Sequence, residues 1–317
     1  MQTRVARVWD HIRHWQTRRK LHWVFVALLA GVWMVILGGM LWAYWPTLVA
    51  FRWQVRWGPL AIGALLYPFD LLLAAFAWAC ILEGLGERRL SFREHWRIYA
   101  GTLAAGRIPG APWHIAGRAA LYDQQQVSKR VVGVASGLEI ILMIISGLLT
   151  GIFITPVLIK QVTPWIWGGA IFLGLGALHP SMIRWLLKLL KCEAPPPRPY
   201  WERFIWLALY GLVWMGGGAI LYCLINTLYP LSISALPYVI GIWGFSGAIS
   251  VMAFFSPSGL GIREITLTTL LTFLLPVGLS LVVAVIARIF FTVLEIISAI
   301  MTPLLIKFIK TIVKNTP

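Results

Sequence analysis

The sequence predicts an all-α, polytopic membrane protein, a helix bundle of about six full spans with two re-entrant or broken hairpin segments. Of its 317 residues, 59% are hydrophobic and 12% are charged, whereas about a quarter of the residues in a soluble domain are charged. The apolar residues come in long runs, and residues 204–262 contain no Asp, Glu, Lys or Arg. These runs do not alternate with polar residues as barrel strands do, so helices are predicted.

Each of six apolar segments is long enough to cross the hydrocarbon core, for which a helix needs roughly 20 residues. The first segment is too long for the apolar part of a signal peptide and lacks a small-residue cleavage site, so we expect it to remain as a span. Three adjacent glycines in the fifth, Gly216, Gly217 and Gly218, predict close helix packing. The predicted spans are residues 22–45, 58–82, 131–158, 164–187, 204–229 and 278–303.

The pattern of segments indicates one integral membrane domain, residues 1–317, in two halves. Residues 1–20 are basic and predict either an interfacial helix or a frayed tail. The first half covers residues 21–187 and the second covers residues 204–317. The cytoplasmic linker between them, residues 188–203, contains three consecutive prolines and is expected to be stiff.

The distribution of Lys and Arg predicts the orientation. The net charge of +16 would suit nucleic acid, but the charges lie at the ends of apolar runs, so no nucleic-acid partner is expected. With both termini in the cytoplasm, twenty-two Lys and Arg lie on the cytoplasmic side, and only Arg52, Arg56 and Lys160 lie outside. Because positive loops stay inside, this orientation is favoured. Arg263 and Arg288 are left at membrane depth.

Two segments must turn back under this orientation. Residues 99–116 lie between two cytoplasmic loops, and residues 233–275 begin and end outside. Short apolar pieces broken by Gly and Pro are typical of re-entrant segments; two complete crossings are the alternative for the second. The two segments enter from opposite sides, which suggests an inverted repeat with a substrate site near the midplane. The breaks are at Pro109 and Gly110 in the first and at Pro257, Gly259 and Gly261 in the second.

The residues around the breaks carry a resemblance to a known family. The second break reads Pro257-Ser258-Gly259-Leu260-Gly261-Ile262-Arg263-Glu264 and is followed by Arg288, while residues 108–118 and Val127-Ser128 form the first motif. In these motifs, and over nearly its whole length, the chain resembles the lysylphosphatidylglycerol synthase transmembrane region family, a flippase-like membrane domain. It departs from that pattern at Glu139, which is followed by Ile140 rather than arginine. No counterpart of the synthases' aminoacyl-transferase domain is expected.

The resemblance implies a protein of the bacterial or archaeal plasma (inner) membrane that handles lipid headgroups. The expected function is a lipid flippase or translocase that moves an anionic or phosphate-bearing headgroup, with membrane lipids as partners. The alternative is a non-transporting accessory subunit of a membrane glycosyltransferase or lipid-modifying enzyme. An enzyme acting on a lipid phosphate is less favoured, because the sequence shows no paired His or Asp constellation. No cofactor or metal is expected, because the sequence carries no P-loop, dinucleotide or zinc motif.

Arg263 is the strongest candidate for lipid binding. A charge at membrane depth costs from about 2.5 kcal/mol upward unless it is paired or hydrated, and arginine binds phosphate through a bidentate fork. The helix that follows would present its N-terminus to the same anion. The alternative is that Arg263 pairs with Glu264 or Glu295 and only locks the hairpin.

The remaining candidates are charged residues close to the breaks or inside spans. Arg288 and Glu295 are seven residues apart on one helix face, and a structural cross-helix salt bridge is the alternative to lipid binding. Glu139 is either a proton-coupling site or the partner of Arg118 or Arg107. Arg107 and Arg118 either form a cytoplasmic anion vestibule or are ordinary positive-inside residues. The full set is Glu264, Arg288, Glu295, Arg118, Glu139, Arg107 and, as a lesser candidate, Asp70.

Overall fold

The computed structural model describes most of the chain. Backbone and side chains are described for residues 54–86, 89–103, 113–151, 201–253 and 261–302, together with the helix backbone at 45–50 and 303–315 and isolated positions within 35–42 and 168–188. Every regular element in these residues is a helix, so the all-α prediction is confirmed there. The elements are α2 (Trp45–Ala50), α3 (Trp57–Gly84), α4 (Phe92–Leu103), α5 (Trp113–Asp123), α6 (Lys129–Thr150), α10 (Trp201–Leu228), η3 (Ile233–Ala235), α11 (Leu236–Met252), α12 (Ile262–Leu271) and α13 (Val277–Asn315).

Five helical stretches among the described residues are long and apolar enough to cross a membrane, so the chain is a helical membrane protein. Four of them, α3, α6, α10 and α13, fall on predicted spans. The fifth is the continuous stretch Ile233–Met252, formed by η3 and α11, where the sequence predicts the first leg of a hairpin. The predicted spans 22–45 and 164–187 lie outside the described residues except for isolated positions.

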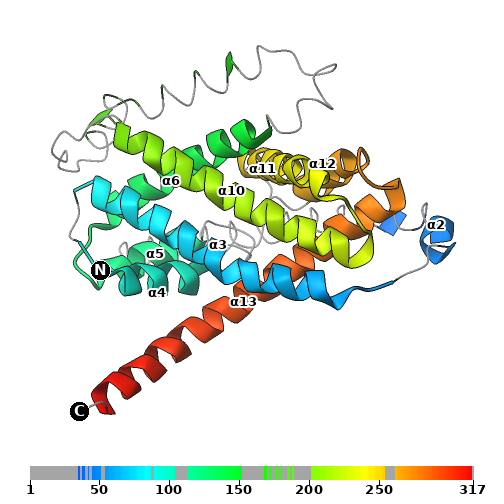
Figure 1. The fold of residues 1–317 in the computed structure, drawn as a ribbon. Coiled ribbons are helices and arrows are strands. Elements are labelled where there is room, and N and C mark those ends of the chain that lie inside the picture. Colours follow the sequence, from blue (N-terminus) through cyan, green and yellow to red (C-terminus); the bar gives the residue numbers. More distant parts are fainter. Residues whose placement is uncertain are drawn as a thin grey trace, which may run out of the picture.

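Helices α3 and α10 lie side by side in opposite directions (Figure 1). The backbone N–H of Arg56, just before α3, donates to the carbonyl oxygen of Thr227 near the end of α10 at 2.9 Å. At the opposite end, Gly84 of α3 lies against the indole ring of Trp206. We call these the Trp57 end and the Gly84 end of the bundle. Helix α10 begins at the Gly84 end. Helix α6 runs parallel to α10 and therefore also begins at the Gly84 end, whereas α11 runs antiparallel to α10 and begins at the Trp57 end.

Three adjacent glycines allow α10 to contact two helices closely. Gly216 faces the carboxyl group of Asp70 in α3, and Gly217 faces the indole of Trp243 in α11. A Cβ atom at Gly218 would lie 2.5 Å from the Cα atom of Ile240, also in α11. Side chains at these positions would push the helices apart, so the prediction of close packing at the three glycines is confirmed.

The second predicted hairpin is formed by α11 and α12. Helix α12 has 10 residues, which corresponds to about 15 Å, and it packs against both α11 and α13. It begins directly after Gly261, whose φ of 84° lies in the region that favours glycine. Pro257 and Gly259 lie outside the described residues. Because α12 is short and packs against α11, the chain returns along α12 from inside the bundle to the Trp57 end, where α13 starts (Figure 1).

The first predicted hairpin is formed by α4 and α5, which run antiparallel. The ring of His95 lies beside that of Tyr122, while Thr102 lies beside Gly117 further along. Helix α4 begins at Phe92, well before the predicted segment 99–116, because Glu94 accepts hydrogen bonds from the backbone N–H and hydroxyl of Ser91. The break itself, with Arg107, Pro109 and Gly110, lies outside the described residues. This hairpin enters from the Gly84 end, opposite to the other.

The glycine contacts predict a clear difference between two substitutions in α10. Gly218→Ala should lower the free energy of unfolding by about 1–3 kcal/mol, because its Cβ would collide with the α11 backbone. Gly211→Ala, on the same helix, meets no atom within 4 Å and should be neutral or stabilising by up to about 1 kcal/mol. Thermal denaturation of both variants in detergent measures this difference. Equal stabilities would contradict the packing described.

Candidate functional site

Glu264 organises the start of α12. Its Oε2 atom accepts a hydrogen bond from the backbone N–H of Gly261 at 2.9 Å, which caps the helix. Its Oε1 atom accepts one from Nη1 of Arg288 in α13 at 2.7 Å. The carboxylate is 2% exposed, so burial strengthens this ion pair relative to one in water. Glu264 thereby fixes the first turn of α12 against α13.

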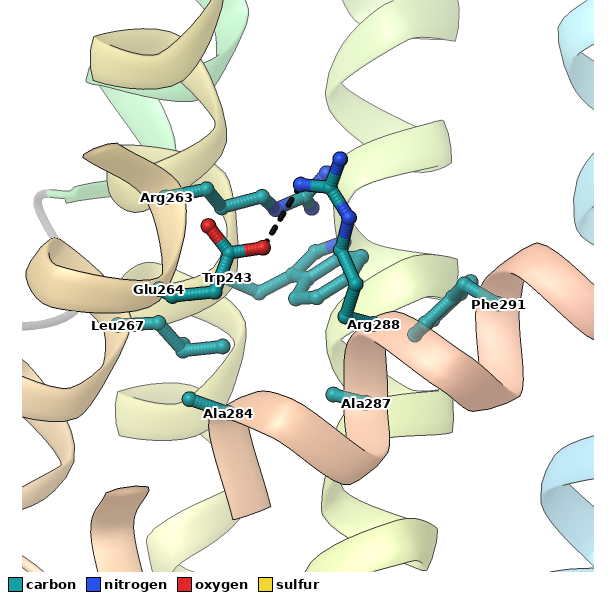
Figure 2. A pocket seen from close by; sticks show the side chains of 8 residues that line it. All are labelled: Trp243, Arg263, Glu264, Leu267, Ala284, Ala287, Arg288 and Phe291. Atoms are coloured by element: carbon teal, nitrogen blue, oxygen red, sulfur yellow. Dashed lines mark hydrogen bonds and ion pairs between the residues drawn. The ribbon is translucent and has the colours of Figure 1, made fainter. Parts of the chain in front are cut away.

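Arg263 lies beside this ion pair, over an aromatic ring. Its Cζ atom is 3.9 Å from the centre of the Trp243 ring, a cation–π distance. The same indole stacks on Phe291 of α13 with ring centres 4.5 Å apart. Figure 2 shows Arg263 and Arg288 extending toward each other beside Trp243. Two arginines and one glutamate therefore meet here.

These residues line a pocket between α11, α12 and α13. It contains about 280 Å³ of space not filled by atoms, its open mouth included. Among its lining residues the arginines outnumber the single carboxylate, so the pocket carries an excess positive charge. The lining residues are Trp243, Arg263, Glu264, Leu267, Ala284, Ala287, Arg288 and Phe291.

The pocket lies about midway along the spanning helix α10. Trp243 rests against Gly217 of α10, which is about 24 Å from the start of that helix and about 16 Å from its end at the usual rise per residue. A hydrocarbon core is about 30 Å thick. The guanidinium of Arg263, over the Trp243 ring, is therefore near the middle of a spanning helix.

A second ion pair, in which both residues are buried, joins the other hairpin to α6. Nη1 of Arg118 in α5 lies 2.5 Å from Oε2 of Glu139 in α6, and their residues are 1% and 5% exposed. The hydroxyl groups of Tyr99 and Tyr210 donate to the other carboxylate oxygen at 3.0 and 3.2 Å. Glu139 is therefore satisfied by three donors from three helices.

The Arg118 guanidinium is enclosed by aromatic rings. Its Cζ atom is 4.1 Å from the ring centre of Tyr99 and 4.5 Å from that of Trp78. This position differs from the cytoplasmic anion vestibule that the sequence suggests for Arg118, because the fold buries it against its counter-ion. Pairing with Arg118, one of the alternatives for Glu139, is the arrangement found.

A polar chain that the sequence does not reveal continues from Trp78 toward the Gly84 end. The indole N–H of Trp78 donates to the hydroxyl of Tyr122 at 2.9 Å, and Nδ1 of His95 lies 2.8 Å from the same oxygen. Nε2 of His95 is 3.8 Å from the carboxylate of Glu83. Burial lowers the pKa of His95, while Glu83 and Glu94 act in the opposite direction. These partners come from three helices, so sequence spacing gives no signal for them.

The structure brings together three of the predicted site residues at the second break and two at the first. Arg263, Glu264 and Arg288 share the pocket, and Arg288 forms the cross-helix salt bridge considered for it. Glu295, two turns further along α13, does not line the pocket. At both breaks, a charged residue on the short helix pairs with an opposite charge on the next long helix. The short helix carries the arginine at the first break and the glutamate at the second. Whether these residues bind lipid stays a prediction.

No protein-family model, curated protein or solved structure matches this chain. The resemblance to the lysylphosphatidylglycerol synthase transmembrane region family therefore remains an expectation that rests on the motifs alone.

The Arg118–Glu139 pair predicts an asymmetry between single and double substitutions. Glu139→Ala leaves Arg118 buried without its counter-ion, so the free energy of unfolding should fall by about 3–5 kcal/mol. A double variant, Arg118→Leu with Glu139→Leu, removes both charges and should lose less. Thermal denaturation in detergent compares them. As a control, Asp123→Ala breaks the exposed contact to Lys129 and should cost at most about 1 kcal/mol; a double variant as unstable as Glu139→Ala would refute the assignment.

His95 predicts a dependence of stability on pH. Its pKa in the folded protein is below the ordinary value of 6.5, so just below that pH the unfolded chain binds more protons. The free energy of unfolding should therefore decrease as the pH falls from above 6.5 toward the folded pKa. His95→Gln should flatten this decrease, as measured by denaturation midpoints over that pH range. An unchanged slope in the variant would show that His95 is not its source.

Proposed function

We propose that the chain is a lipid translocase that moves an anionic or phosphate-bearing headgroup across the plasma membrane. The observation that carries this proposal is the pocket with Arg263 and Arg288, which lies about midway along the spanning helices. Charges at this depth are expensive and are usually functional. A headgroup bearing negative charge would balance the excess positive charge of the pocket.

The chemistry of the pocket suits a phosphate more than an apolar ligand. Arginine offers a planar fork of N–H donors that matches phosphate oxygens. The first turn of α12 adds the positive end of a helix dipole next to Arg263. Glu264, whose oxygens accept hydrogen bonds from Arg288 and Gly261, would hold the arginine side chain in place while the ligand binds.

The arrangement of the hairpins supports translocation over static binding. They enter the bundle from opposite ends, and each forms an ion pair with the following long helix in which the carboxylate is buried. Such opposed broken segments are typical of inverted-repeat transporters, which expose a central site alternately to the two sides by rocking of the halves. The excess of Lys and Arg in the loops supports cytoplasmic termini, and the family resemblance agrees with a lipid substrate.

The test is headgroup scrambling by the purified chain in proteoliposomes of phosphatidylcholine with labelled phosphatidylglycerol. Arg263→Ala should slow scrambling on the order of tenfold or more, because it removes a charged hydrogen-bond donor worth about 1.5–3 kcal/mol. Arg89→Ala, which removes an 82% exposed arginine, should keep the wild-type rate.

Two results would contradict the proposal. Wild-type rates in the Arg263→Ala variant would remove this residue from the mechanism. An isolated chain that scrambles no lipid but co-purifies with a stable membrane partner would favour the accessory-subunit alternative.

A further inference from the structure

Asp70 is a carboxyl group in the middle of a spanning helix. It lies about 20 Å from each end of α3 at the usual helical rise. Its side chain is directed at α10, where its Oδ1 atom is buried and lies against Gly216. A side chain at position 216 would occupy the space of the carboxyl group, so the glycine creates the site in which Asp70 sits.

Within the described part of the chain, the buried Oδ1 atom of Asp70 has no hydrogen-bond partner. On its own helix, Tyr67 lies one turn away. On α13, which also packs against α3, Arg288 is engaged by Glu264, and Glu295 is a further carboxylate. On α6, Glu139 is engaged by Arg118 and by Tyr99 of α4 and Tyr210 of α10. The other titratable groups of α4 and α10 that the structure describes are Arg93, Glu94, His95, Arg97, Glu202, Arg203, Tyr222 and Cys223. Arg93, Glu94, Glu202 and Arg203 are at the starts of the two helices, at the Gly84 end.

This environment favours the protonated form of Asp70. An ionised carboxylate in an apolar interior without a compensating donor costs several kcal/mol, and such groups take up a proton instead. The neutral acid needs no cation, which is consistent with a site whose facing wall is a glycine. Ionisation would require water or a cation to reach the α3–α10 interface.

Asp70 is structurally connected to the arginine pocket by two routes. The first route runs through α10, where Gly216 contacts Asp70 and the next residue, Gly217, contacts Trp243. The guanidinium of Arg263 lies over the Trp243 ring. Through aromatic rings, Trp243 stacks on Phe291, whose ring centre is 6.1 Å from that of Tyr67, three residues before Asp70. Trp243 and Phe291 both line the pocket. A movement of α3 relative to α10 that admits water to Asp70 would therefore also displace these side chains.

We infer that Asp70 is a proton-binding site that couples proton uptake and release to movement of the headgroup in the arginine pocket. The proton is exchanged with water, and only the O–H bond of the carboxyl group forms or breaks. The protonation of Asp70 is inferred from the residues around it. The coupling to headgroup movement rests on the proposed function. Asp70→Asn has nearly the same shape as the neutral acid but cannot release a proton.

The protonation is tested by infrared spectroscopy of the full chain in phosphatidylcholine nanodiscs. At neutral pH we expect a carbonyl band of a protonated carboxyl group that is lost in Asp70→Asn. The band should persist in Asp123→Asn, which alters an exposed aspartate at the end of α5. If the wild-type and Asp70→Asn spectra show no such difference at neutral pH, Asp70 is ionised and the inference is overturned, whether or not the chain transports lipid.

The coupling is tested in the same phosphatidylcholine–phosphatidylglycerol proteoliposomes at a series of pH values. The wild-type scrambling rate should change with pH, and Asp123→Asn should show the same profile. Asp70→Asn should lose the pH dependence. A variant that keeps the wild-type profile would overturn the coupling. A wild-type protein that does not scramble would instead contradict the proposed function, and the infrared band would still decide whether Asp70 binds a proton.

Discussion

A charge in an apolar interior is stable only beside an opposite charge or several hydrogen-bond donors, and this constraint positions both short helices that follow the breaks. Helices α5 and α12 have 11 and 10 residues, and helices of that length are marginal alone. Each is joined to the next long helix by one ion pair with a buried carboxylate, Glu139 with Arg118 or Glu264 with Arg288. Each hairpin is therefore joined to the bundle by an ion pair in addition to its apolar packing.

Helix α10 packs against both α3 and α11 and sets the distance between them. Its glycines allow α3 and α11 to approach the same turn from two sides, so Asp70 and Trp243 contact consecutive residues. The arginine pocket and the lone carboxyl group consequently share one structural support, although they belong to different halves of the sequence. A rearrangement at one of them that moved α10 would alter the other.

The fold class could be predicted from the hydrophobic runs, because the bilayer fixes the length of a span. The pairing of charges could not. Glu295 is seven residues from Arg288 on the same helix, but Arg288 bonds to Glu264, which only the folding of the hairpin brings near. The start of α4 depends on a local signal, Ser91 followed by Glu94, which hydropathy does not detect. The setting of Asp70 is created by α10, distant in sequence.

Helix α13 continues without interruption for 39 residues, from the Trp57 end past the far side of the bundle (Figure 1). At the usual rise it is about 58 Å long, nearly twice the thickness of a hydrocarbon core. Arg288 lies about a third of the way along α13, so about 40 Å of helix extends beyond the ion pair with Glu264. A tilt of this helix by about 10° around Arg288, at the pocket, would displace its far end by roughly 7 Å.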